Sequence, residues 1–319
     1  MNAVIRPDYD QDELRRFEAA TGSPVDFTLT LAWARAAEAS GYGEGVRAMV
    51  TLDGDPVALA QGILRRRYGI TKLASGSNGG VGLAWRTGHD DAGLACLDHL
   101  LRRTRPSGFQ IFSAVVVPLP RLKWEPAFTF EINLEPPLGT IIDRMSKEAR
   151  YAARRAEKLG VSVRVADTRA DLNRAYDLIE RTSEARHFAL PPRNYSLALH
   201  REFGKEGHQT CVVATLAGTP VSAAALLGSG RKVSWWKGGS TEEGYRASAG
   251  NPVQLAAIRW AKDSGFRTYD LGGTDPHRET YAGIHRFKAS LGGNLVERTL
   301  GNRTTRMFRL ASRLLHVLR

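Results

Sequence analysis

An eight-residue segment recurs 164 positions further along the chain, and this internal repeat restricts the possible folds more than any other feature. Residues 50–57 have the sequence VTLDGDPV, and residues 214–221 have the sequence ATLAGTPV. Each copy predicts a strand, a tight turn at Gly54 or Gly218, and a second strand that starts at Pro56 or Pro220. Proline is tolerated at the start of a strand, so both copies fit the same hairpin.

The segments that follow the two hairpins correspond as well. Each hairpin precedes a glycine-rich loop, a helix and an apolar strand, which we place at 75–80, 90–103 and 109–117 in the first copy and at 237–240, 252–263 and 266–271 in the second. The same order of elements in both copies predicts a duplicated α/β (α+β) unit with a mixed sheet. A chain of 319 residues is long enough for two such domains.

Proline and glycine interrupt the hydrophobic periodicity at residues 135–139, and we place the domain boundary there. The predicted domains are therefore 1–138 and 139–319. Within the second domain, Thr168 and Asp171 have the spacing of a capping box. Asn251 followed by Pro252 predicts a helix with Asn251 as its N-cap and proline in the first helical position.

The charge composition favours a polyanionic partner. The chain contains 45 lysines and arginines against 33 acidic residues, which gives a formal net charge of +12. A basic surface attracts nucleic acid, pyrophosphate or an anionic membrane face. Because arginine far outnumbers lysine, a compositional bias of the genome is the alternative explanation.

Cysteine usage and hydropathy predict a cytoplasmic protein. The two cysteines, Cys96 and Cys211, are far apart and form no C-x-x-C pair, which suits a reducing compartment. The first residues are too polar for a signal peptide, and the chain contains no run of about 18 apolar residues.

The common catalytic motifs are absent from the sequence. It has no G-x-S-x-G, H-E-x-x-H, G-x-x-x-x-G-K-[ST] or G-x-G-x-x-G segment, and its eight histidines lack metal-ligand spacing. We therefore expect direct transfer between two bound substrates, without a metal or a covalent nucleophile.

Two glycine-rich stretches near the C-terminus carry the strongest functional signal. Residues 269–276 (YDLGGTDP) predict a strand ending in a turn where backbone can approach a ligand, and residues 283–293 (GIHRFKASLGG) predict a second strand with Phe287 and Lys288. From the residues alone, Lys288 is either a solvated charge at a sheet edge or a cation directed at developing negative charge. Asp270 is expected to order the glycine turn.

The arrangement of these motifs resembles the second half of Fem-family transferases. The resemblance is specific over residues 250–293 and rests on NP at 251–252, IRWA at 258–261, YDLGGT at 269–274, GI at 283–284, FK at 287–288 and GG at 292–293. It implies tandem GNAT-like domains, each with a mixed, mostly antiparallel sheet flanked by helices. It also implies aminoacyl-tRNA as the donor substrate, no bound cofactor, and an amine acceptor such as a peptide, a peptidoglycan precursor or an antibiotic intermediate.

Under this resemblance Lys288 becomes the main catalytic candidate. Attack of an amine on an aminoacyl ester creates an oxyanion, which a positioned ammonium group stabilises by roughly 3 kcal/mol. Phe287 would shape the pocket beside it. The proton released by the amine would go to the leaving oxygen of the ester or to Asp275, and we favour the leaving oxygen.

Further residues are expected to bind substrate. The cleft would be lined by the strand around residues 235–238, by the glycine turn and by the segment after it, which supply Trp236 or Lys237, Gly272, Gly273, Thr274 and Tyr281. Plain packing is the alternative for the aromatic side chains.

Residues 146–158 predict a helix with one basic face. At 100° per residue, Lys147, Arg150, Arg154 and Lys158 fall on the same side. The face is either solvated or contacts phosphates, of tRNA or of an acceptor that carries pyrophosphate. Basic residues at this place in Fem-like proteins favour the second interpretation.

The loop that opens with Arg246 bears on the donor. In acetyl-CoA-dependent GNAT enzymes the equivalent loop resembles [RQ]-x-x-G-x-[GA], whose amides bind pyrophosphate at a helix N-terminus. Here Ala249 and Asn251 occupy the glycine positions, and Pro252 has no amide proton. This departure weakens the case for an acyl-CoA donor.

The C-terminal residues 302–319 predict a basic amphipathic helix. It either packs on its own domain or adheres to tRNA or to an anionic membrane as a peripheral contact. The oligomeric state is not predicted. Two other functions stay open: an acyl-CoA-dependent GNAT enzyme and a non-catalytic RNA-binding protein.

Overall fold

The chain divides into two compact units in a computed structural model that describes residues 2–23, 25–67, 70–74, 81–113, 123–166 and 168–305. Unit 1 comprises Met1–Pro126, Asn194–Glu202 and Arg298–Arg319, and unit 2 comprises Ala127–Arg193 and Phe203–Glu297. The division therefore falls at 126/127 instead of the expected 138/139, and unit 1 also includes two segments from beyond this point.

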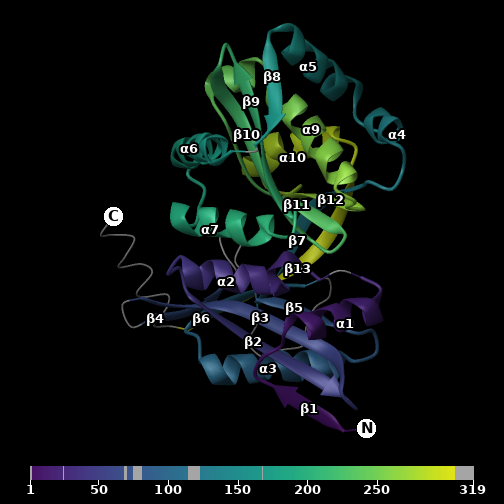
Figure 1. Ribbon diagram of the computed structural model, residues 1–319, viewed down its shortest axis with the longest axis vertical. Helices are drawn as coiled ribbons and strands as arrows, with labels where there is room; N and C mark the ends of the chain where they lie inside the picture. The colour runs from purple at the N-terminus through teal and green to yellow at the C-terminus, as the bar shows by residue number, and fades with distance from the viewer. Residues whose placement is uncertain are drawn as a thin grey trace. The chain divides into compact units, whose positions relative to one another are not determined.

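Unit 1 is a mixed sheet covered by helices (Figure 1). Its elements are β1 (Ala3–Arg6), α1 (Gln11–Thr21), η1 (Phe27–Leu29), α2 (Leu31–Ala39), β2 (Glu44–Leu52), β3 (Asp55–Arg67), β4 (Ile70–Ala74), β5 (Gly82–Trp85), α3 (Asp90–Thr104), β6 (Gly108–Ser113), most of α7 (Arg193–Gly204) and the end of β13 (Asn294–Thr304). The strand order is β1-β2-β3-β4-β6-β13, with β5 also paired to β3. Only the β4–β6 step of this order is parallel.

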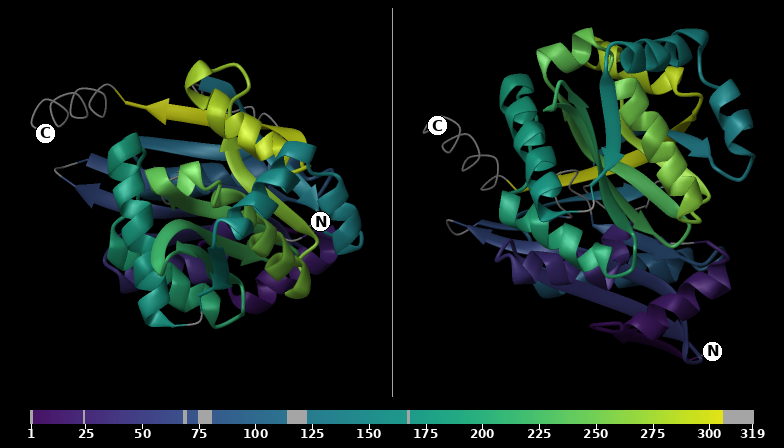
Figure 2. Two further views of the ribbon diagram at one scale, coloured as in Figure 1. Left: turned by 90° about the horizontal axis from the view of Figure 1, so that it is seen from above. Right: turned by 45° about the horizontal axis from the view of Figure 1, so that its top comes forward.

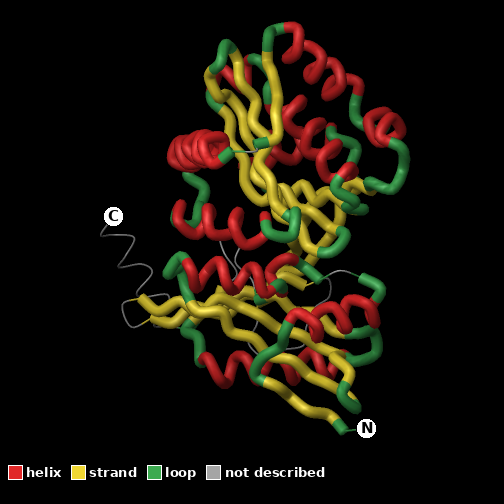
Figure 3. The backbone as a smooth tube through the Cα atoms, viewed as in Figure 1, coloured by secondary structure: helices red, strands yellow, loops and turns green. Residues whose placement is uncertain are grey.

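The central strands of unit 1 are buried on both faces. Ala58 and Ala60 of β3 belong to a core cluster shared with α3, whereas Leu59 belongs to a second cluster shared with α1. Figure 3 shows the sheet of this unit between these helices. Strands covered on both faces need largely apolar sequence, which explains the buried run from Val57 to Leu64. Its one polar side chain, Gln61, donates to the carbonyls of Thr28 and Thr30.

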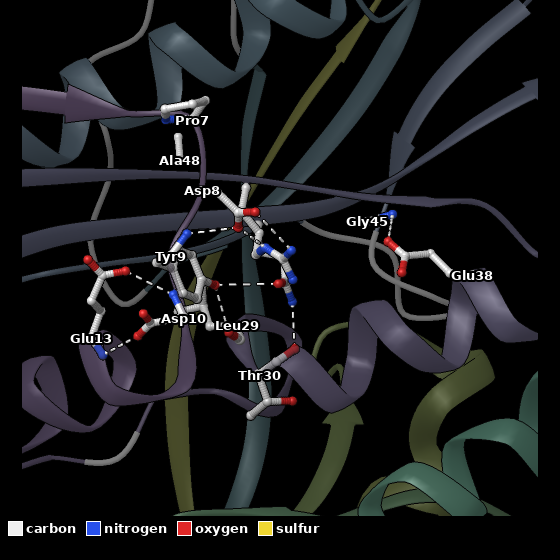
Figure 4. A network of polar contacts seen from close by, with 12 residues as sticks. Pro7, Asp8, Tyr9, Asp10, Glu13, Leu29, Thr30, Glu38, Gly45 and Ala48 are labelled. Atoms are coloured by element: carbon white, nitrogen blue, oxygen red, sulfur yellow. Dashed lines mark hydrogen bonds and ion pairs between the residues drawn. The ribbon is translucent and has the colours of Figure 1, made fainter.

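A polar network fixes the N-terminal segment onto the sheet of unit 1 (Figure 4). The buried Tyr9 hydroxyl donates to the Leu29 carbonyl at 2.7 Å, and its burial raises the pKa of the phenol. Asp10 and Glu13 form a reciprocal capping box that starts α1. Asp8 binds Arg47 of β2 at 2.6 Å, so the start of α1 is tied to a central strand.

Unit 2 has the same kind of architecture. Its elements are the end of β7 (Lys123–Asn133), α4 (Leu138–Asp143), α5 (Lys147–Lys158), β8 (Val161–Val165), α6 (Arg169–Arg186), β9 (Gln209–Leu216), β10 (Thr219–Ser229), β11 (Lys232–Ser240), α8 (Glu242–Arg246), α9 (Gly250–Asp263), β12 (Thr268–Thr274), η3 (Glu279–Tyr281) and α10 (Ala282–Ser290). The strand order is β7-β12-β11-β10-β9-β8. Only the β11–β12 step is parallel.

Helices α6 and α9 cover opposite faces of the unit 2 sheet (Figure 2). The face beneath α9 holds the main core cluster, which also includes side chains of α5. On the other face α6 lies directly against β11, because a Cβ added to Gly239 would stand 2.5 Å from Thr182 Oγ1. Glycine at this position is what allows the helix to come so close.

The two hairpins predicted from the repeat are confirmed and match in detail. The turn residues Asp53 and Gly54 have φ of 50° and 90°, and Ala217 and Gly218 have φ of 48° and 79°. Positive φ at both central residues defines a type I′ turn. Each hairpin also has a register shift just after its proline, which leaves Val57 and Val221 without a partner. The element order and these shared irregularities confirm the expected α/β architecture with mixed sheets.

The two units exchange strands along the sequence. β7 follows β6 in the chain but pairs with β12 of unit 2, and β13 follows β12 but pairs with β6 of unit 1. Each unit therefore completes its sheet with a strand from the other half of the sequence. A division into independent domains at 138/139 does not describe this arrangement.

Several local predictions need comment. Thr168 caps α6 as expected, with its side chain accepting from the Asp171 amide. Helix α9 begins at Gly250, so its N-cap is Ala249 and not Asn251, because the tight α8–α9 connection lets the helix start early. Residues 237–240 lie within β11 and do not form a loop. The predicted loop at 75–80, the end of the strand at 114–117 and the tail from 306 lie outside the described residues.

Candidate functional site

The candidate site lies where the parallel strands β11 and β12 stop pairing. Their register runs from Lys232 opposite Thr268 to Ser234 opposite Asp270. Beyond this point both strands are irregular: Trp236 has no partner in β10, and β12 shifts its register against β7 between Asp270 and Gly273. Bulges of this kind redirect side chains and end pairing, which opens the sheet at one point.

Lys288 reaches this opening from a helix. The predicted second strand is wrong, because residues 282–290 form helix α10, which ends before Gly292 at φ +82°. Residues 284–290 (IHRFKAS) are compatible with a helix, and the left-handed glycine after them terminates it. As a result Lys288 does not lie at a sheet edge, and only 6% of its surface is exposed.

The Lys288 ammonium is held by backbone. Its Nζ donates to the carbonyls of Gly272 at 2.9 Å and Gly273 at 2.7 Å, and it lies 5.3 Å from the centre of the Trp235 ring. Burial lowers the pKa of Lys288 to about 8, with a smaller lowering by Lys237 and an opposing effect of Asp270. Two of the three ammonium donors are used by these carbonyls, so one N–H can serve a ligand.

An acidic and hydroxyl cluster fixes the glycine turn that presents these carbonyls. Asp270 accepts from the Gly272 amide at 2.8 Å and from Thr129 Oγ1, as predicted for an aspartate that orders the turn. Lys232 forms ion pairs with Asp270 at 2.8 Å and with Glu131 at 2.9 Å. Burial disfavours both charges, but the pairing lowers the pKa of Asp270 and raises that of Lys232. The turn therefore rests on a buried charged network.

Aromatic side chains wall the opening. Trp235 contacts Phe287 edge to face at 6.2 Å, and the Phe287 ring lies 3.5 Å from where a Cβ of Gly250 would stand. The predicted choice of Trp236 as a cleft residue is not supported, because its side chain is buried and Trp235 is the tryptophan beside Lys288. The unpaired position of Trp236 changes the alternation of side chains along β11.

Lys237 is the second lysine of this region. Burial lowers its pKa to about 8, and its Nζ lies 5.9 Å from the centre of the Trp236 ring. Lys237 also lowers the pKa of Lys288, because the two ammonium groups are close enough to repel each other. A ligand that carries or develops negative charge would relieve their repulsion.

The other predicted residues near the turn have structural partners. Asp275 accepts from the His277 amide at 2.9 Å and pairs with Arg278 at 3.0 Å, so it is bound locally and not directed at Lys288. The buried Thr274 hydroxyl lies 3.2 Å from His285 Nδ1. Tyr281 precedes α10 and is 39% exposed.

The basic face predicted on residues 146–158 lies on α5, which runs from Lys147 to Lys158. Lys147, Arg154 and Lys158 are exposed, whereas Arg150 is partly buried and pairs with Asp143 at 3.1 Å. Asp143 therefore neutralises part of this basic face. The N-cap Ser146 donates its amide to the Ser290 carbonyl at 2.9 Å, so this face starts beside the end of α10.

The loop from Arg246 to α9 offers few free amides. The amide groups of Ala247, Ser248, Ala249, Asn251 and Val253 all donate to backbone carbonyls within residues 243–249. Arg246 is exposed, and its carbonyl accepts from Arg155 at 3.2 Å. Since Pro252 has no N–H, this helix start has little left to bind a pyrophosphate.

Three further observations concern metal sites, membrane-spanning helices and cysteines. Within the described ranges, no group of three or more His, Cys, Asp or Glu side chains could hold a metal ion. Across the same part of the chain, none of the helices combines the length and apolarity that crossing a bilayer requires. Cys96 and Cys211 are both free and buried.

Sequence reasoning missed Trp235, Thr129, Glu131 and Lys232. The last three form the charged network from strands that are far apart in the chain, which no local motif reveals. Trp235 had a usable signal. Its indole lies over Gly238, where an added Cβ would stand 2.6 Å from Nε1, so the glycine marks the side to which the ring folds.

Comparison with protein families matches residues 143–288 to the acetyltransferase (GNAT) domain. The matched segment ends at Lys288 and contains the whole opening between β11 and β12. No curated protein matches the chain significantly.

Several solved structures have the same fold over almost the whole chain. FemX is 16% identical with a TM-score of 0.71, covering 94% of this chain and 97% of that one. A tandem GNAT protein from the clavulanic acid biosynthesis pathway is 13% identical with a TM-score of 0.58, covering 95% and 98%. The C-terminal domain of a putative lysylphosphatidylglycerol synthetase from Agrobacterium fabrum is 13% identical with a TM-score of 0.55, covering 96% of each chain. The protein therefore has a GNAT fold.

Proposed function

We propose that this protein is an N-acyltransferase that moves an aminoacyl group from aminoacyl-tRNA to the amine of an acceptor. The observation that carries the proposal is the buried Lys288 ammonium, fixed by the Gly272 and Gly273 carbonyls where β11 and β12 part. The geometry supplies a cation with one remaining donor at a buried position. This is what an oxyanion formed during acyl transfer requires.

The proposed reaction proceeds in two stages. The unprotonated acceptor amine attacks the ester carbonyl, a C–N bond forms, and the carbonyl oxygen becomes an oxyanion that Lys288 stabilises. The intermediate then collapses, the C–O bond to the ribose breaks, and the ribose oxygen takes the proton that the nitrogen loses. The products are an amide and a tRNA with a free hydroxyl. The local pairing of Asp275 with Arg278 favours this substrate-assisted route over Asp275 as the base.

Two features support an RNA-bound donor over acyl-CoA. The amides at the start of α9 are largely engaged with backbone, which leaves little of a pyrophosphate site. The exposed cations of α5 begin beside the end of α10, so a polyanion bound along them would lead towards Lys288. The structural similarity to FemX and to a lysylphosphatidylglycerol synthetase domain agrees with this choice.

For the acceptor, we propose a peptide, a peptidoglycan precursor or a natural-product intermediate with a free amine. The described residues include no long helical arm of the kind that some bridge-forming Fem relatives carry, which favours a small acceptor. A soluble cytoplasmic location follows from the same proposal.

One observation favours a second function. The domain family matched over residues 143–288 is described as an acetyltransferase, so acetyl-CoA is the competing donor. Both donors are therefore compared in the same assay.

The test measures amide formation by purified protein with a pool of charged tRNA or with acetyl-CoA. Purification without nuclease identifies any RNA that accompanies the protein. We expect transfer from charged tRNA, no transfer from acetyl-CoA, and a loss of at least about 100-fold in kcat for Lys288→Met. Transfer from acetyl-CoA alone would establish the competing function. Unchanged turnover in Lys288→Met would remove the oxyanion role.

The chain offers a matched control. Lys262 donates to the consecutive carbonyls of Leu134 at 2.8 Å and Glu135 at 3.4 Å, which is the same type of contact at another place in unit 2. Lys262→Met should keep its transfer rate, while any loss through misfolding would affect both variants. Arg154→Ala should raise KM without changing kcat and should weaken the dependence of KM on salt.

A further inference from the structure

A hollow on the α6 face of unit 2 combines arginines with an aromatic ring. It has a volume of about 590 Å³ and is lined by one side of α6, by the start of β10, by the end of β11 and by α8. Trp235 and Phe287 of the transfer site pack against the core cluster that includes side chains of α9. Helix α9 covers the face of this sheet opposite to α6 (Figure 2). The hollow is therefore separate from the opening around Lys288.

Three arginines of α6 supply the positive charge of the hollow. Along the helix, Arg174 and Arg186 are twelve positions apart, or about 18 Å, and Arg181 lies between them. Within the described part of the chain, the side chain of Arg181 makes no hydrogen bond or ion pair. Arg174 stands 3.8 Å from Asp171, a carboxylate already bound to Arg164. These guanidinium groups thus keep most of their capacity for an anion.

The acidic side chains of the hollow are neutralised by other partners. Asp177 pairs with Arg193 at 2.5 Å, outside the hollow. Glu242 is largely exposed and stands 3.6 Å from Arg246. The arginines of α6 therefore determine the sign of the local charge, which is positive.

An exposed aromatic ring completes the set of groups. Tyr245 is 54% exposed, and the Arg186 guanidinium lies over its ring at 5.3 Å from the centre. Tyrosine and arginine planes are the surfaces on which unpaired bases stack.

We propose that this hollow binds single-stranded RNA, with an unpaired base against Tyr245 and successive phosphates along Arg186, Arg181 and Arg174. Cations spread over about 18 Å fit more than one phosphate, which favours an RNA chain over a free nucleotide. The net charge of +12 acts in the same direction. The site concerns binding only and is independent of the chemistry at Lys288.

The test measures the binding of a fluorescein-labelled 12-nucleotide single-stranded RNA to the full chain by fluorescence anisotropy over a range of salt concentrations. The double variant Arg181→Ala with Arg186→Ala should raise Kd at least about tenfold and reduce the slope of log Kd against log salt by about 1.4. Tyr245→Ala should raise Kd about tenfold, and Tyr245→Phe should stay within about twofold because the ring is kept.

The control double variant is Arg15→Ala with Arg102→Ala. These arginines are 69% and 81% exposed and pair with acids on α1 and α3, so the variant removes the same charge elsewhere. An equal loss of binding in the control, or no loss in the α6 variant, would overturn the proposal. So would ATP or AMP binding at the hollow as tightly as the RNA, since that result assigns a free nucleotide.

Failure of the proposed function is distinguishable from failure of this site. Transfer from a short aminoacyl ester of adenosine, which cannot span both places, should be unchanged in the α6 double variant. If wild-type protein transfers nothing from any ester yet binds RNA through α6, the RNA site is supported and the proposed transfer function is rejected.

Discussion

The parallel strand pair of unit 1 (β4–β6) and that of unit 2 (β11–β12) have the same backbone arrangement and opposite electrostatics. Lys72 of β4 lies opposite Gly108, and Lys232 of β11 lies opposite Thr268, so the partners are 36 residues apart in both units (72 to 108 and 232 to 268). Burial and Arg65 lower the pKa of Lys72, whereas Asp270 and Glu131 raise that of Lys232. The acids of unit 2 allow a charged lysine to support the glycine turn that holds Lys288.

The hairpins next to these parallel strand pairs, in contrast, are alike in both units. Their turns and their bulges at Val57 and Val221 are the same in both units. The geometry of this hairpin is thus common to both units, whereas the charged side chains around the parallel strand pairs differ. Four predictions test how the similarities and differences between the units affect stability and transfer activity.

The largest effect is expected from Asp270→Ala. The change leaves Lys232 buried with one acidic partner fewer, and breaking a buried pair costs about 3 to 5 kcal/mol. Lys72→Met at the corresponding place of unit 1 should leave stability almost unchanged, because burial already disfavours that charge. Urea denaturation of both variants measures the contrast. Equal losses would remove the electrostatic distinction between the units.

A second prediction concerns the carbonyls that hold Lys288. Gly272 has φ +76°, and an added Cβ would stand 3.0 Å from the Trp235 carbonyl. Gly272→Ala should cost about 1 to 2 kcal/mol of stability and lower the kcat of transfer at least about tenfold. Gly273→Ala is the matched control, because no atom lies within 4 Å of its added Cβ. Full activity in Gly272→Ala would show that the turn geometry does not position Lys288.

The pH dependence of transfer follows from the lowered pKa of Lys288. Below pH 8 the ammonium is present and can stabilise an oxyanion; above pH 8 it loses its proton. With saturating acceptor, kcat should fall about tenfold for each pH unit above 8. A kcat that keeps rising to pH 10 would contradict the role of the charged form.

The smallest effect is expected in the unit 2 hairpin. Ala217 adopts φ 48°, which asparagine tolerates better than alanine, while the unit 1 turn has Asp53 at the same place. Ala217→Asn should therefore stabilise the protein by about 0.5 to 1 kcal/mol. In thermal unfolding, the Tm should rise for Ala217→Asn and fall for Asp53→Ala.

The sequence predicted the architecture better than the site. The repeat around Gly54 and Gly218 predicted both hairpins, because turn chemistry is local. The sequence also indicated Lys288, but on the wrong type of element. Gly283 in the first turn of α10 and Gly292 after its end resemble strand boundaries. The role of Thr129 could not be predicted, because it depends on strand pairing with a distant part of the chain. The sequence pointed to Trp236 instead of Trp235, because the bulge in β11 depends on its pairing with β10.

The exchanged strands have a consequence for synthesis on the ribosome. β6 ends at Ser113, but its partner residues in β13 begin at Thr299, 186 positions later (113 to 299). At about 5 to 20 residues per second, the nascent first unit waits roughly 10 to 40 s with that strand edge uncovered. A chaperone that shields an open edge during this interval would find its target in β6.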